Sequence, residues 1–137
     1  LKKTLFLVLI LLVLVGLADF IAHNFFKETI QRYRPSHHLI LKEQLHFYLK
    51  SNGDFYTGGK YGFVSNHAAN MAALGWGLYL LLKNDYPNSW KYLFSFVLLI
   101  SFSRIYLGVH YMTDIIGGWL LGITLAQISY FTIKKYL

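Results

Sequence analysis

Four long apolar runs constrain the fold of this chain more than any other feature. The first run covers residues 4–23 and is interrupted only by Asp19. The other three lie at residues 64–82, 92–107 and 113–133. A helix needs about 20 such residues to cross the hydrocarbon core of a bilayer. The sequence therefore predicts an all-α, polytopic membrane bundle, with four transmembrane helices in a single domain over the 137 residues.

The composition agrees with a membrane protein. Charged residues make up 14% of the chain, well below the roughly 25% of a soluble domain, and the mean hydropathy is +0.42. The net charge of +7 would suit a nucleic acid partner, yet most basic residues flank apolar runs and form no basic stripe. We therefore expect membrane lipids with anionic head groups as partners, and no nucleic acid. The absence of cysteine excludes disulfides and thiol chemistry.

The first apolar run also has a second interpretation. Two lysines precede it and residues 16–18 resemble a cleavage site, as in a secretory signal peptide. A membrane helix is favoured because the helical pattern continues through residues 19–34, until Pro35 ends it. The chain does not begin with methionine, and we expect it to start inside a longer protein.

The only long polar connection covers residues 36–62. Within it, leucines recur every four residues from Leu41 to Leu49, which predicts a short amphipathic helix over residues 39–49 at the membrane interface. The same connection holds three histidines without a metal-binding pattern. We interpret them as solvated side chains: His37, His38 and His46.

An arginine, a histidine and a carboxylate stand close together in apolar sequence before the last run. His110 and Asp114 are four residues apart, so a helix beginning at Val109 would let Asp114 hold one imidazole nitrogen and leave the other to attack. Gly108 can end the preceding helix and turn the chain, so that Arg104 and His110 converge on one anion. The alternative is three polar residues at the rim of a helix pair, with Arg104 snorkelling to water.

Two other segments supply groups suited to phosphate. Ser65 is expected to cap the helix of residues 64–82, and the unpaired N–H groups at such an end, including that of Asn66, receive phosphate readily. Lys27 and Arg34 are seven residues apart, two helical turns, and are expected to point to one side. Taken alone, each of these residues also fits an ordinary helix cap or a flanking basic position.

The four spans place all of these side chains at one end of the bundle. That convergence favours a shared site over separate structural roles. The opposite end carries six lysines close to the span ends: Lys2, Lys3, Lys83, Lys91, Lys134 and Lys135. By the positive-inside rule that end faces the cytoplasm, and the candidate site faces outward.

Taken together, the residues resemble the type 2 phosphatidic acid phosphatase (PAP2) superfamily. Its motifs read K-x6-R-P, P-S-G-H and S-R-x5-H-x3-D. The first and third match residues 27–35 and 103–114 at every defined position, and the second matches residues 64–67 with departures at Val64 and Asn66. Family members usually have six spans, with the first motif after the third. The resemblance therefore implies that two N-terminal helices of the family core are missing from this chain.

The resemblance also implies a metal-independent reaction without a cofactor. His110 would attack phosphorus and form a phosphohistidine, Asp114 would hold its tautomer, and His67 would protonate the departing oxygen. Cationic side chains would take the place of a metal. The phosphate oxygens would be bound by Lys27, Arg34, Ser65, the N–H of Asn66, and Arg104.

The implied substrate is a membrane lipid phosphate or diphosphate. Undecaprenyl diphosphate is the first choice, and lipid A, phosphatidylglycerophosphate and phosphatidate are alternatives. The implied location is the bacterial inner membrane, with the site facing the periplasm or outside.

Three competing interpretations come from other classes of protein. A zinc site would use the many histidines, but H-x3-D lacks a third ligand at fixed spacing and HExxH is absent. Related haloperoxidases bind vanadate with the same constellation, but they are soluble. A non-catalytic lipid-phosphate binder stays open. The sequence does not predict an oligomeric state.

Overall fold

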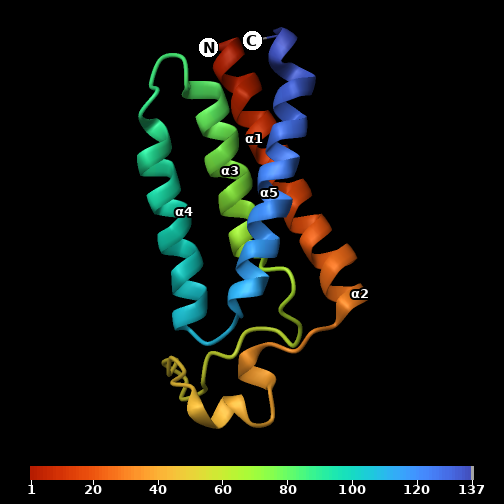
Figure 1. Cartoon of the computed structure of the whole chain (residues 1–137), viewed down its shortest axis with the longest axis vertical. Helices are drawn as coiled ribbons and strands as arrows, with labels where there is room; N and C mark the ends of the chain where they lie inside the picture. The colour runs from red at the N-terminus through yellow and green to blue at the C-terminus, as the bar shows by residue number, and fades with distance from the viewer. Residues whose placement is uncertain (137) are drawn as a thin grey trace.

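The computed structural model describes residues 1–136 and forms an elongated bundle of helices (Figure 1). The described residues contain no β-strand, so the all-α prediction is confirmed. The long helices are α1 (Lys2–Ile21), α3 (Asn66–Leu82), α4 (Ser89–Tyr106) and α5 (Met112–Ile133). The short elements are the π-helical turn η1 (Ala22–Lys27), the helix α2 (Glu28–Ile30), and the 3-10 turns η2 (Pro35–His37), η3 (Leu41–Gln44) and η4 (Lys134–Tyr136).

Small residues let the central helices of the bundle approach closely. A methyl group added to Gly118 of α5 would lie 2.7 Å from the carbonyl oxygen of Ser65 and 2.9 Å from the Cβ of Ala68. Gly122 meets the same helix one turn further along, and α3 packs against α1 and α4 as well. These two glycines therefore form a helix-packing face.

The first helix ends earlier than the sequence predicts. α1, η1 and α2 run on as one helical stretch, but it stops at Ile30, and Gln31 adopts a left-handed conformation with φ of 51°. The following residues are extended instead, and the Arg34 amide donates to the Lys60 carbonyl at 3.2 Å. The expected helix through Arg34 is therefore wrong. Pro35 disfavours helical geometry in Arg34, the residue before it. The Lys60 carbonyl supplies a hydrogen-bond partner for the Arg34 amide outside a helix.

The predicted amphipathic helix over residues 39–49 is also wrong. Only η3 forms there, and residue 45 onward is extended. The Tyr56 amide donates to the Tyr48 carbonyl at 2.8 Å, and Leu49 and Phe55 form an isolated β-bridge. The chain reverses at Gly53, where φ is +85°. This turn and its backbone pairing outweigh the helical tendency of the four-residue leucine spacing.

Two stretches are long and apolar enough to cross a bilayer by length and composition. They are Lys2–Ile30 and Met112–Ile133. α4 lies beside α3 and exposes large apolar side chains such as Phe96, Leu99 and Phe102 along its outer surface. Exposed apolar faces of this kind suit lipid contact. The count of four transmembrane helices stays a prediction.

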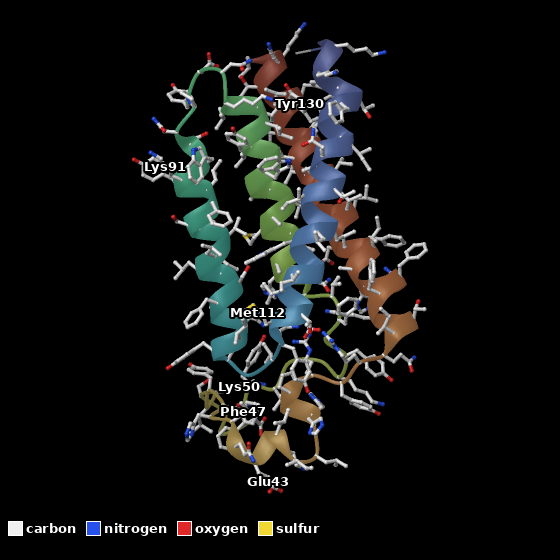
Figure 2. The ribbon with its side chains drawn as sticks, viewed as in Figure 1. Glu43, Phe47, Lys50, Lys91, Met112 and Tyr130 are labelled. Carbon is white, nitrogen blue, oxygen red and sulfur yellow. The ribbon has the colours of Figure 1, made fainter. Side chains whose placement is uncertain are left out.

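The segments that carry the three motifs gather at one end of the bundle. Figure 1 shows residues 31–64 and the α4–α5 connection together at that end, away from the chain termini. Figure 2 places Glu43, Phe47 and Lys50 there, with Lys91 and Tyr130 toward the opposite end. The predicted convergence of the motif segments on one end is confirmed.

Candidate active site

Six of the predicted site residues are buried at this end of the bundle, although each comes from a different element or connection of the chain. Lys27 lies on η1, Arg34 precedes η2, and Ser65 caps α3. Arg104 lies in the last turn of α4, His110 follows in the connection, and Asp114 lies in the first turn of α5. Their exposed fractions are 9% or less. Charged side chains buried together in this way need partners, and those partners define the site.

The connection between α4 and α5 turns at Gly108, where φ is +67°. The turn reverses the chain as predicted, and the Val109 amide donates back to the Arg104 carbonyl at 3.3 Å. The condition that a helix begins at Val109 is not met, because α5 begins at Met112. His110 therefore lies in the connection, and its proximity to Asp114 depends on the helix cap rather than on one helical face.

Asp114 fixes the imidazole through this cap. Its Oδ2 accepts from the Tyr111 amide at 2.9 Å, within a capping box in which Tyr111 is the N-cap residue. The same oxygen lies 3.2 Å from His110 Nδ1. A carboxylate at Nδ1 favours the tautomer that carries its proton there, so Nε2 is the nitrogen available for attack. The geometry supports the role expected for Asp114.

Asp114 has a second cationic partner that the sequence did not indicate. Arg32 Nη2 forms an ion pair with Asp114 Oδ1. The Arg32 guanidinium also lies over the rings of Phe63, at 4.7 Å, and Tyr111, at 5.3 Å from the ring centroid. A useful signal was available: Arg32 and Arg34 are two residues apart, and residues at that spacing in an extended segment point to one side.

The two motif arginines are held by oxygen atoms around the site. Arg34 Nε donates to the Tyr61 carbonyl at 3.0 Å, and its Nη1 donates to the Val109 carbonyl at 3.4 Å. Arg104 Nη2 donates to the Tyr56 hydroxyl at 2.7 Å, a contact that the sequence did not indicate. Arg104 Nε is buried and has no hydrogen-bond partner among the described residues. That unpaired donor is suited to an anionic oxygen.

The environment keeps the His110 imidazole neutral. Burial lowers its pKa below the ordinary value, and the positive charges of Arg34, Lys27 and Arg104 lower it further. A neutral imidazole has the free electron pair that a nucleophile needs. The same cations would stabilise negative charge on a bound phosphoryl group.

The comparisons with known proteins agree with this geometry. The family model described as the PAP2 superfamily matches residues 7–136. This chain belongs to the PAP2 superfamily. A solved PAP2-type phosphatidylglycerolphosphate phosphatase of Bacillus subtilis superposes with a TM-score of 0.70 at 25% identity, over 93% of this chain and 59% of that one.

Two curated relatives carry different substrate names. A lipid A 4'-phosphatase of Porphyromonas gingivalis is 38% identical over 99% of this chain and 53% of its own length. An undecaprenyl-diphosphatase of Sulfolobus acidocaldarius is 35% identical over 50% of this chain and 32% of its own length. The chain spans about half the length of the first of these relatives.

The second PAP2 motif retains the N-cap residue Ser65 and differs from the family pattern at the next residue, Asn66. Ser65 is fully buried, its Oγ accepts from the Ala68 amide at 3.4 Å, and its own amide donates to the Asp114 carbonyl at 3.0 Å. Asn66 stands where the motif has glycine, and its Nδ2 donates to Asp19 Oδ1 at 2.8 Å. Asn70 donates to the same oxygen at 3.0 Å. The extra side chain is thus tied to α1, while the backbone N–H of Asn66 remains part of the helix end.

The other histidines of the PAP2 chain lie outside the buried pair. His67 is exposed in the first turn of α3, where the charges of Arg104, Lys27 and Arg34 act on it. Of the loop histidines, His38 and His46 are exposed, as predicted, and His38 Nδ1 accepts from the amides of Ile40 and Leu41, each at 3.3 Å. Among residues 1–136 there is no group of three or more His, Cys, Asp or Glu side chains that could hold a metal ion.

Proposed function

We propose that this chain carries the active site of a metal-independent lipid phosphatase. The observation that carries the proposal is the buried His110–Asp114 pair, with Nδ1 facing the carboxylate, among Lys27, Arg34 and Arg104. Neutral imidazole beside fixed positive charge is the arrangement that phosphoryl transfer to nitrogen requires. Membership of the PAP2 superfamily supports the same reaction.

In the proposed reaction His110 Nε2 attacks phosphorus in line with the leaving oxygen. A P–N bond forms, the bond from phosphorus to that oxygen breaks, and His67 gives the departing oxygen a proton. Arg34, Arg104 and Lys27 stabilise the charge on the equatorial oxygens, where it accumulates in the transition state.

The second half of the reaction releases phosphate. A water molecule attacks the phosphohistidine, His67 accepts its proton, and the P–N bond breaks to restore neutral His110. Ser65 and the helix N-terminus at Asn66 contribute further hydrogen bonds to the phosphate oxygens.

A phosphorylated glycolipid of the lipid A type is the favoured substrate. The support is the lipid A 4'-phosphatase relative, which matches 99% of the chain at 38% identity, whereas the undecaprenyl-diphosphatase matches 50% of it at 35% identity. Undecaprenyl diphosphate, which the sequence analysis placed first, is the second candidate and is supported by the shorter match. Both lipids place a phosphate at the membrane surface, where this end of the bundle would lie.

The decisive experiment measures phosphate release in detergent and excess chelator. Lipid A, undecaprenyl diphosphate and phosphatidylglycerophosphate are offered separately to the wild type, to His110→Ala and to His46→Ala, which removes an exposed loop histidine. We expect release from one lipid by the wild type and His46→Ala, and none by His110→Ala. Activity that disappears with chelator and returns with a divalent ion would contradict the metal-independent reaction.

The role of His67 is tested by comparing leaving groups. A diphosphate releases a phosphate, which needs little protonation, whereas a monoester releases an alkoxide. The variant His67→Ala should therefore lose more activity on a phosphomonoester than on a diphosphate. Equal losses on both substrates would reject His67 as the general acid.

We also propose that the chain lies in a bacterial inner membrane with the site facing outward. The support is the group of lysines near the span ends at the opposite end of the bundle. The chain has no cysteine, so a single cysteine introduced at Ser51 or at Asn84 is the one labelling site in these residues and reports whether that end of the bundle is accessible. An impermeant maleimide should label Ser51→Cys in intact cells and Asn84→Cys only after lysis. The reverse pattern would overturn the orientation.

A further inference from the structure

Arg32 contacts the Asp114 carboxylate directly and has no part in the mechanism above. Its Nη2 pairs with Oδ1, whereas His110 Nδ1 and the Tyr111 amide lie at Oδ2. The Asp114 side chain is fully buried, while that of Arg32 is 35% exposed. One oxygen of the Asp114 carboxylate thus contacts Arg32, and the other contacts the proposed nucleophile His110.

The position of Arg32 is set by rigid neighbours. Its guanidinium lies over two aromatic rings, those of Phe63 and Tyr111, and its carbonyl accepts from the Gly62 amide at 2.8 Å. A methyl group on Gly62 would lie only 3.0 Å from Asp114 Oδ2, so this segment packs directly on the carboxylate. Aromatic faces hold a planar guanidinium in a defined orientation, which distinguishes Arg32 from a mobile surface arginine.

We propose that Arg32 is a positioning residue that keeps the Asp114 carboxylate charged and oriented, and thereby holds His110 as the neutral, Nδ1-protonated nucleophile. A buried carboxylate without a cation takes up a proton readily, and a protonated Asp114 could no longer accept from Nδ1. The proposal rests on the phosphatase reaction above, in which His110 attacks through Nε2.

Several other charges act on the same pair. They come from every element that surrounds it, and removing any positive charge favours proton uptake by the pair as a unit. Arg32 differs from the others because its contact is with Asp114 itself. The other groups are Lys27 of η1, Arg34 before η2, His67 of α3 and Arg104 of α4, with the Tyr111 ring beside Arg32.

The test compares neutral and charged replacements of Arg32. The pH dependence of kcat/KM is measured for Arg32→Gln, Arg32→Met and Arg32→Lys on the lipid phosphate that the wild type hydrolyses. The neutral variants should move the acidic limb to higher pH by about one unit, because the pair takes up its proton more readily. Arg32→Lys keeps the charge and should move the limb much less.

Lys60 supplies the matched control. Its Nζ lies over the rings of Tyr33 and Tyr61, at 5.4 and 5.3 Å, on segments next to Arg32 and Gly62, and it is exposed. The variant Lys60→Met removes one positive charge that solvent already screens. Its acidic limb should stay in place. A shift as large as that of Arg32→Gln would assign the effect to net charge and overturn the proposal.

A second measurement requires no turnover. Histidine labelled with ¹³C and ¹⁵N reports the tautomer and titration of His110 by NMR, so the proposal is tested even if the wild type hydrolyses none of the lipids offered. In the wild type, His110 should show the Nδ1–H tautomer and stay neutral from pH 5.5 to 8. In Arg32→Gln, His110 should take up a proton at a higher pH than in the wild type.

Two results would refute the role of Arg32. One is a neutral variant that folds but has the wild-type pH profile and the wild-type His110 titration. The other result applies if no neutral variant folds. In that case, a wild-type His110 that carries its proton on Nε2, or that titrates near the ordinary histidine pKa of about 6.5, contradicts the proposal.

Discussion

Replacing Gly118 by alanine should destabilise the bundle where α5 crosses α3. The new methyl group would lie 2.7 Å from the Ser65 carbonyl oxygen, 2.9 Å from the Ala68 Cβ and 3.0 Å from the Ala69 nitrogen. Two of these atoms belong to the backbone and cannot rotate away. The helices must therefore separate, and this happens beside the cap that ties Ser65 to Asp114.

The magnitude follows from two opposing terms. Overpacking a close contact costs about 1–3 kcal/mol, whereas alanine gains up to about 1 kcal/mol over glycine inside a helix. The net loss in the free energy of unfolding is then about 1–2 kcal/mol. For a chain of this size that corresponds to a fall in Tm of roughly 3–10 °C. Because Ser65 moves relative to Asp114, kcat should fall as well.

The assay is thermal unfolding in detergent, followed by circular dichroism, with Gly16→Ala as the control. Gly16 lies in α1 and has no atom within 4 Å of an added methyl group, so its replacement should leave Tm unchanged or raise it. The same Gly→Ala change is thus expected to lower Tm at Gly118 and not at Gly16. A Gly118→Ala variant as stable as the wild type would refute the close packing of α5 on α3.

Three further predictions concern the site. Asp114→Asn should lower kcat by roughly 10³-fold or more, because an amide no longer selects the Nδ1–H tautomer; single-turnover phosphate release measures this. Burial lowers the pKa of His110, so the unfolded chain binds that proton more readily. The associated stability is present above about pH 6.5 and is lost as the pH falls below it, and Tm should drop more steeply there in the wild type than in His110→Gln. Asn66→Ala should lower the free energy of unfolding by about 1 kcal/mol, and adding it to Asp19→Ala should cost little more, because both remove the same hydrogen bond.

The helical architecture could be predicted because it depends on local composition. Apolar runs of sufficient length specify helices whatever their neighbours are, and α3, α4 and α5 begin within three residues of the predicted runs. The two wrong elements lie in or next to the polar connection. Helix formation there competed with backbone pairing between segments far apart in the sequence, such as residue 34 with residue 60. No local pattern reports that competition.

The candidate site could be predicted as a set of residues but not as a set of contacts. The motif spacing singled out His110 and Asp114, but the condition of one shared helical face is not met, because α5 begins at Met112. Arg32 stands at an undefined position of the first motif and Tyr56 lies outside the motifs, and their partners are 82 and 48 residues away in the sequence, so no local pattern indicated either contact.

The sequence by itself determined the helical class, the end of the bundle at which the polar residues gather, and the pair His110 and Asp114 that we propose as nucleophile and positioning carboxylate. These follow from apolar run length and from residue type at fixed spacing, both of which are local properties. Only the tertiary structure decided how the charges are shared. A carboxylate has two oxygens, and which cation occupies the second one depends on how the segment after α2 folds against α5. Tertiary packing places Arg32 at that oxygen, because its guanidinium lies over the rings of Phe63 and Tyr111 and contacts Asp114.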